Sequence, residues 1–163
     1  MTDLFAWLES LPLSLFIRDS DSIWAFPMFL FAHTFGMSIV AGGASLIALA
    51  LLGCWPASTP LKPLERLYPA IWFGFWVNLI TGSVLLAADA TKRLTNPDFF
   101  IKMACVFAGV FLLSMMRKRV FLDPQLDVAP VSRQAKVLAW LSLICWYGAI
   151  LTGRLLAYTS TSR

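Results

Sequence analysis

The chain has 163 residues, of which 59% are hydrophobic and 13% are charged, and its formal net charge is +4. A soluble domain carries about a quarter charged residues, so this composition predicts a single integral membrane domain over residues 1–163, with the lipid bilayer as its main partner. The lysines and arginines behind the net charge fall mainly in predicted loops, which excludes a nucleic-acid patch. The sequence also lacks phosphate-binding loops and the common hydrolase motifs.

The N-terminal residues 2–17 predict a short amphipathic helix that lies in the membrane interface. Apolar residues predominate there and charges are few, and Trp7 is placed to anchor the segment at headgroup level. The first 22 residues are acidic rather than basic and lack a small-residue cleavage pattern. We therefore do not expect a secretory signal peptide.

The first membrane span is predicted at about 23–53. No charged residue occurs from Ser22 to Leu61, a run that exceeds the roughly 20 residues needed to cross a bilayer. His33, the one histidine of the chain, lies roughly 15 Å below the outer surface at the helical rise. A titratable ring at that depth is a candidate functional residue.

Three further spans are predicted at about 67–88, 97–117 and 135–158. Gly74 and Gly82 share one face of the second span, which predicts close approach of another helix. Asn96 as N-cap and Pro97 at the first helical position mark the start of the third span. The predicted fold class is therefore all-α, a four-transmembrane-helix bundle with an N-terminal interfacial amphipathic segment.

Four spans place both termini on one side of the membrane. The loops on the other side, within 54–66 and 117–136, contain seven lysines and arginines, whereas the termini side has fewer at its surface and an acidic N-terminus. By the positive-inside rule, the basic loops are predicted to be cytoplasmic and the termini to face outward.

His33 has two interpretations. As a structural residue, its neutral imidazole would form a hydrogen bond with Asn78 or Tyr147 and hold helices together. As a functional residue, it would bind a metal or haem, or carry a proton. Met37 lies four residues later on the same helix face, and a thioether beside an imidazole suits copper(I), although methionine is also an ordinary packing residue.

Lys102 and Arg154 are both predicted to lie roughly 6–8 Å inside their helices, near the outer side. Charges at that depth must pair, reach the interface or face a polar cavity. Asp89, at the end of the second span, could pair with either of them. Alternatively, the two cations form an outward-facing anion pocket, and their offset of roughly 8 Å from His33 fits a haem with its iron on His33 and its propionates on Lys102 and Arg154.

A six-coordinate haem would need a second axial ligand. Met37 shares a helix face with His33 and is excluded from this position. Met103 on the third span could supply it, as could His33 of a second subunit in a homodimer. Two histidines from one chain are excluded, since the sequence contains one.

Several short motifs together resemble a known class of membrane protein. They are His33 followed by Gly42-Gly43, Thr81-Gly82, Phe100 with Lys102, Arg117-Lys118-Arg119, and the segment from Ala149 to Arg154. The pattern resembles small bacterial four-helix membrane proteins of unknown function. It is similar in plan to the membrane domain of copper-resistance-D proteins and, more distantly, to haem-binding membrane protoporphyrinogen oxidases. The resemblance implies copper or haem handling in the bacterial inner membrane, centred on His33.

The function we expect is an inner-membrane redox or metal module in which His33 ligates haem b or copper, with electron transfer as one possible role. Lys102 and Arg154 would receive carboxylates on the outer side. Two alternatives stay open. One is a non-catalytic structural or assembly subunit of a larger membrane complex, and the other is a small copper or solute transporter that uses His33 and Met37 as a relay.

Overall fold

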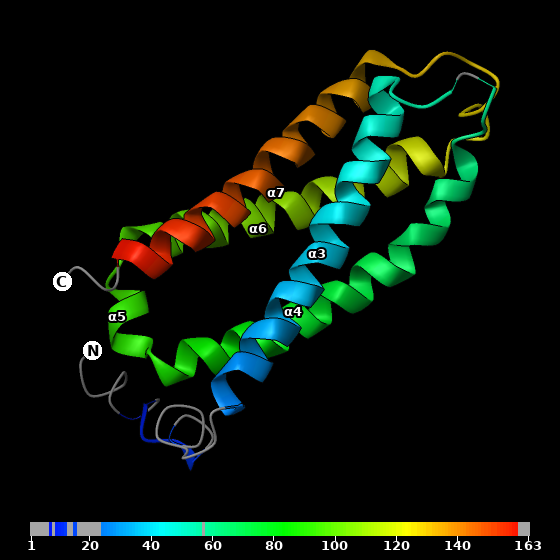
Figure 1. Cartoon of the computed structure of the whole chain (residues 1–163). Helices are drawn as coiled ribbons and strands as arrows, with labels where there is room; N and C mark the ends of the chain where they lie inside the picture. The colour runs from blue at the N-terminus through cyan, green and yellow to red at the C-terminus, as the bar shows by residue number, and fades with distance from the viewer. Residues whose placement is uncertain (1–6, 8, 13–14, 16–23, 57, 160–163) are drawn as a thin grey trace.

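The computed structural model describes residues 7, 9–12, 15, 24–56 and 58–159, and none of these forms a strand (Figure 1). The elements are the long helices α3 (Ala25–Leu52), α4 (Tyr68–Ala88), α6 (Pro97–Met116) and α7 (Arg133–Thr159), the short helix α5 (Ala90–Leu94), the 3-10 helix η1 (Lys62–Leu67) and the π-helical turn η2 (Arg117–Phe121). Four spans in this part of the chain are long and apolar enough to cross a membrane. The described part of the chain is therefore all-helical, and its four long apolar helices indicate a membrane protein whose helices contact lipid.

The long helices lie where the sequence predicts spans, and local signals explain two of their ends. Asn96 accepts a hydrogen bond from the backbone N–H of Asp98 at 3.0 Å, with Pro97 in the first turn of α6 as predicted. At the other end of the molecule, α3 ends at Gly53, whose φ of 96° is in the left-handed region that glycine adopts without steric cost.

Most of the predicted interfacial segment at residues 2–17 lies outside the described residues. Of its described members, Trp7 is exposed. The Glu9 carboxylate accepts a hydrogen bond from the backbone N–H of Thr91 at 2.8 Å, which brings this segment to α5.

The helices form two hairpins, α3 with α4 and α6 with α7, and α3 also packs against α7 (Figure 1). The shared apolar core occupies only one half of the molecule. In α3 and α6, which run toward the long loops, its buried members start at Val40 and Leu113. In α4 and α7, which run away from these loops, the last buried members are Ile71 and Trp146. All of these positions are in the half nearer the two long loops, and the described residues of the half nearer the termini do not belong to this core.

The loop end is also joined by polar contacts between the two long loops. The Lys62 ammonium donates a hydrogen bond to the backbone carbonyl of Phe121. The Asp127 carboxylate accepts one from the backbone N–H of Leu61 at 2.6 Å. Because each contact joins one hairpin to the other, the loop end is fixed by hydrogen bonds as well as by apolar packing.

Close contact between α3 and α4 depends on two glycines. A β-carbon added to Gly36 would lie 2.9 Å from the carbonyl oxygen of Gly74, and one added to Gly74 would lie 2.8 Å from the β-carbon of Ile39. Real β-carbons essentially never come this close to other atoms, so larger residues would force the helices apart. Gly74 therefore has the close-packing role predicted from the sequence.

Candidate functional site

His33 lies on α3 with its ring against Gly82 of α4. A β-carbon added to Gly82 would lie 2.9 Å from the ring atom Cε1 and 3.3 Å from Nδ1, so the glycine leaves the space that the imidazole fills. The Nδ1 atom is 3.2 Å from the hydroxyl oxygen of Thr81. These two contacts hold the ring in one orientation across the α3–α4 interface.

The hydrogen bonds of Thr81 determine which ring nitrogen of His33 carries the proton. The Thr81 hydroxyl donates its single hydrogen to the backbone carbonyl of Val77, at 2.6 Å. With that hydrogen used, we assign Nδ1–H of His33 as the donor to the hydroxyl oxygen, the tautomer that leaves the lone pair on Nε2. The ring also lies close to the backbone carbonyl of Asn78. Among the side-chain hydrogen bonds of the described residues, the one that reaches the ring is at Nδ1, and none is found at Nε2. A ring held through one nitrogen with the other one open is the usual arrangement of a metal-ligating histidine.

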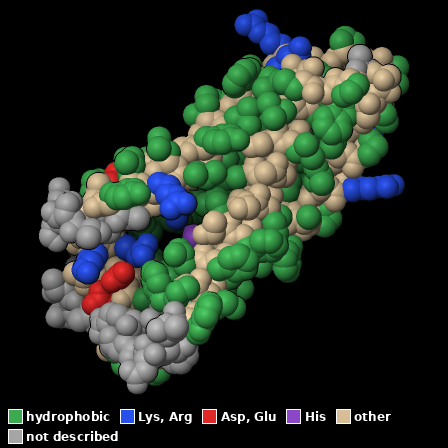
Figure 2. All heavy atoms as spheres, viewed as in Figure 1, with side chains coloured by type: hydrophobic (Ala, Val, Ile, Leu, Met, Phe, Trp, Pro, Cys, Tyr) green, Lys and Arg blue, Asp and Glu red, His purple; other side chains and the backbone are tan. Residues whose placement is uncertain are grey.

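The imidazole lies at the bottom of a hollow in the half of the molecule that lacks the apolar core. Figure 2 shows the histidine at the wall of this hollow, with lysine and arginine side chains and a smaller acidic group around the opening. Lys102 of α6 and Arg93 of α5 are both within electrostatic range of His33 and of one another. The hollow therefore combines an open imidazole nitrogen with positive charge, which suits a ligand that carries anionic groups.

Lys102 of α6 is held against α7 by its aliphatic stem. Its aliphatic stem packs on Gly153 of α7, where an added β-carbon would lie 3.5 Å from Cε. Asp89, which the sequence offers as a partner for Lys102 or Arg154, is instead 3.9 Å from the guanidinium of Arg93, within its own turn. Lys102 has no carboxylate partner among the residues that the structure describes. A partly buried cation in this position can receive an anion.

The other predicted site residues lie in different surroundings. Arg154 is exposed on α7, next to the glycine on which Lys102 packs. Met37 is partly buried against the apolar core. Tyr147 is exposed, and the side-chain oxygen of Asn78 is buried without a hydrogen-bond partner. The side chain that binds His33 is thus Thr81, rather than Asn78 or Tyr147.

Two residues of the hollow were not identified as site residues from the sequence. Thr81 appears there only within a short motif, and Arg93 falls between the second and third predicted spans. In the structure, Arg93 has a buried Nε without a hydrogen-bond partner. A signal for Thr81 was present, since it directly precedes the Gly82 that faces His33. For Arg93 we find no comparable signal, because its position depends on the short helix α5.

No group of three or more histidine, cysteine, aspartate or glutamate residues in the described ranges is arranged to hold a metal ion. Comparison of the chain with family models, curated proteins and solved structures found no match. The resemblance to copper-resistance-D proteins therefore stays a prediction, and the hollow itself is the basis for any functional proposal.

Replacing Thr81 by valine tests the hydrogen bond that orients His33. We expect the free energy of unfolding to fall by about 1 kcal/mol, since the substitution removes a buried hydrogen bond at constant shape. Thr152→Val is the matched control, because Thr152 donates to the carbonyl of Gly148 four residues earlier in its own helix, at 2.8 Å. The measurement is unfolding by sodium dodecyl sulfate in mixed micelles. Equal losses in both variants would show that the bond to His33 contributes nothing.

Proposed function

We propose that this protein is a haem-binding redox module of the bacterial inner membrane, with His33 as one axial ligand. The observation that carries the proposal is the open Nε2 of an imidazole that is oriented by Thr81 and faces a basic hollow. Haem b, when bound, would supply one-electron redox chemistry, and electron transfer is the role that follows from it.

The cationic residues of the hollow fit the carboxylate end of haem. Haem carries two carboxylates, and Lys102 has no acidic partner in the described structure. Lys102, with Arg93 nearby and Arg154 on the adjoining turn of α7, would receive these carboxylates. Thr81 would hold the imidazole so that its lone pair stays on Nε2. The chain would thus supply an oriented imidazole for the iron and positive charge for the carboxylates.

Haem is favoured over copper because of where Met37 lies. A copper(I) site would use the thioether of Met37 together with His33. That side chain packs against the apolar core. Copper stays as the alternative ligand of the same site.

The hollow lies at the end of the bundle that carries the termini. With the basic loops in the cytoplasm, it opens to the outer side of the membrane. A second axial ligand would come from Met103 or from His33 of a second copy of the chain, and the second case makes the functional unit a homodimer.

A non-catalytic role is the second candidate, and one observation favours it. The contacts of His33 with Thr81 and Gly82 already join α3 to α4 without any ligand. In that case the imidazole is a structural hydrogen-bonder, and the protein is a subunit that packs against a larger membrane complex.

Absorption spectroscopy separates the two candidates. Protein purified from haem-replete cells is measured oxidised and then after reduction with dithionite. The haem proposal predicts a Soret band and, after reduction, an α band, with about one haem per chain or per dimer. Colourless protein that also fails to take up added haemin would overturn it, and elemental analysis for copper then tests the alternative ligand.

A further inference from the structure

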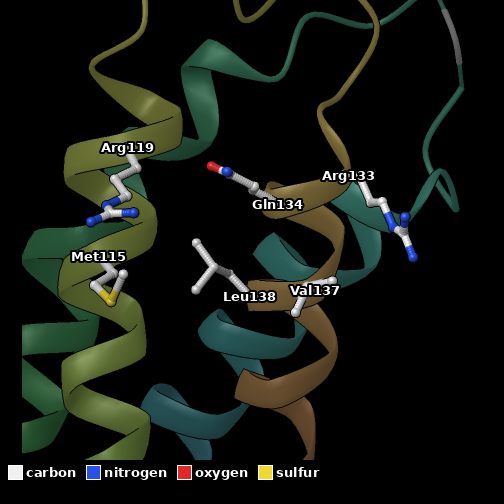
Figure 3. Close-up of a pocket in the computed structure, with 6 residues that line it drawn as sticks. All are labelled: Met115, Arg119, Arg133, Gln134, Val137 and Leu138. Carbon is white, nitrogen blue, oxygen red and sulfur yellow. The ribbon is translucent and has the colours of Figure 1, made fainter.

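A second hollowed site lies at the opposite end of the molecule from His33. It is a groove of about 360 Å³ between η2, the end of α6 and the first turns of α7 (Figure 3). The lining residues are Met115, Arg119, Arg133, Gln134, Val137 and Leu138. None of them belongs to the hollow around His33, so this groove is independent of the proposed function.

The groove is polar toward the loops and apolar toward the membrane. Arg119 follows Met115 by four residues, one helical turn nearer the loop, because α6 and η2 run toward it. Gln134 precedes Leu138 by four residues, so the polar residue of α7 is again the one nearer the loop. Figure 3 shows Arg119 and Gln134 on opposite sides of the groove, while Arg133 points away from it. Both walls therefore change from polar to apolar in the same direction.

Charge at this end of the molecule favours an anion. Arg119 and Arg133 have no acidic partner in the described part of the chain. The first turn of α7 contains no acidic residue, although Arg133 and Lys136 both lie there. Cations near the positive end of a helix dipole are unfavourable, and a bound anion offsets this. The carboxylates described at the loop end, those of Glu65, Asp123 and Asp127, interact instead with Arg117 and with backbone N–H groups.

The depth of the groove identifies the kind of anion. The two spans that form its walls cover Pro97–Phe121 and Arg133–Leu156, so Arg119 and Arg133 lie at span ends, where lipid headgroups are found. Val137, one turn deeper than Arg133, is 50% exposed and faces the surroundings of the bundle. A ligand with a charged head at the level of Arg119 and an apolar tail beside Met115 and Leu138 matches both ends.

We propose that this groove binds one anionic phospholipid. The phosphate lies between Arg119 and Gln134, with the charge of Arg133 at the outer rim, and one acyl chain follows Met115 and Leu138 toward the membrane centre. Basic pockets between helix ends on the cytoplasmic side are a known form of lipid recognition.

The test compares lipid binding by two variants that lose the same charge. Arg119→Gln with Arg133→Gln changes the groove, whereas Lys118→Gln with Lys136→Gln removes two cations from the same ends of η2 and α7 without changing the lining. Native mass spectrometry of detergent-solubilised protein, titrated with phosphatidylglycerol or phosphatidylcholine, gives the affinity of the first bound lipid. We expect wild type and the lysine variant to prefer phosphatidylglycerol, and the arginine variant to bind it at least about tenfold more weakly.

Several outcomes would overturn the proposal. They are equal loss of binding in both variants, no loss in the arginine variant, and equal binding of phosphatidylcholine and phosphatidylglycerol by wild type. Displacement of the bound lipid by inorganic phosphate at equal concentration would also overturn it, because the acyl chain would then contribute nothing. If the arginine variant fails to fold, Gln134→Trp replaces it. This variant retains both arginines, and its bulky ring should fill the groove and exclude the lipid. Full lipid binding by a folded Gln134→Trp variant would also contradict the site.

Discussion

The haem proposal predicts that replacing His33 by glycine removes the Soret and α bands from the purified protein and reduces bound haem to a small fraction of the wild-type amount. The reason is that His33 presents the one open imidazole nitrogen in the hollow, and the sequence contains no other histidine. The measurement is absorbance together with haem content per chain. Because the substitution leaves a space against Gly82, added imidazole should restore part of the absorbance.

Met37→Leu is the matched control for this experiment. It changes a neighbour on the same helix at nearly constant volume, and the side chain packs against the apolar core. We expect it to keep its haem. Full haem occupancy in the His33→Gly variant would remove His33 from the site, and loss in both variants would indicate a general weakening of the bundle instead.

The largest expected loss of stability is that of Gly36→Ala. The new β-carbon would lie 2.9 Å from the carbonyl oxygen of Gly74 and 3.0 Å from the backbone nitrogen of Asn78, and backbone atoms cannot rotate away as a side chain does. The α3–α4 pair must separate, at a cost of about 1–3 kcal/mol in the free energy of unfolding. The measurement is unfolding by sodium dodecyl sulfate in mixed micelles.

Gly42→Ala provides the comparison, since a β-carbon there would have no atom within 4 Å. Its expected effect is close to zero or slightly stabilising, because alanine favours the helix over glycine. If the two variants unfolded at the same concentration of sodium dodecyl sulfate, the close contact between α3 and α4 at Gly36 would be contradicted.

The span positions could be predicted because they depend on local signals. A bilayer requires about 20 consecutive apolar residues in each crossing helix, and such runs are read directly from the sequence. The start of α6 at Pro97 is equally local, since Asn96 caps the helix within two residues. Neither feature requires knowledge of how the helices pack.

The contacts inside the hollow depend on packing and could not be predicted in the same way. The partner of His33 is fixed by the rotation of α3 against α4, which depends on the contact between Gly36 and Gly74. Hydropathy does not specify that rotation, so the sequence does not distinguish Thr81 from Asn78 or Tyr147 as the hydrogen-bond partner of His33. Asp89 pairs with Arg93 because both lie at α5, a short helix in a stretch that the sequence predicts as a loop.

The restriction of the shared core to one half of the molecule has a consequence for the order of assembly. The apolar contacts and the loop hydrogen bonds that join the two hairpins, such as that between Asp127 and Leu61, are complete without anything in the hollow. The four helices can thus insert and associate first, and a ligand can enter afterwards from the side of the termini. Its later loss would break none of these contacts, so the empty and the loaded protein should have the same fold.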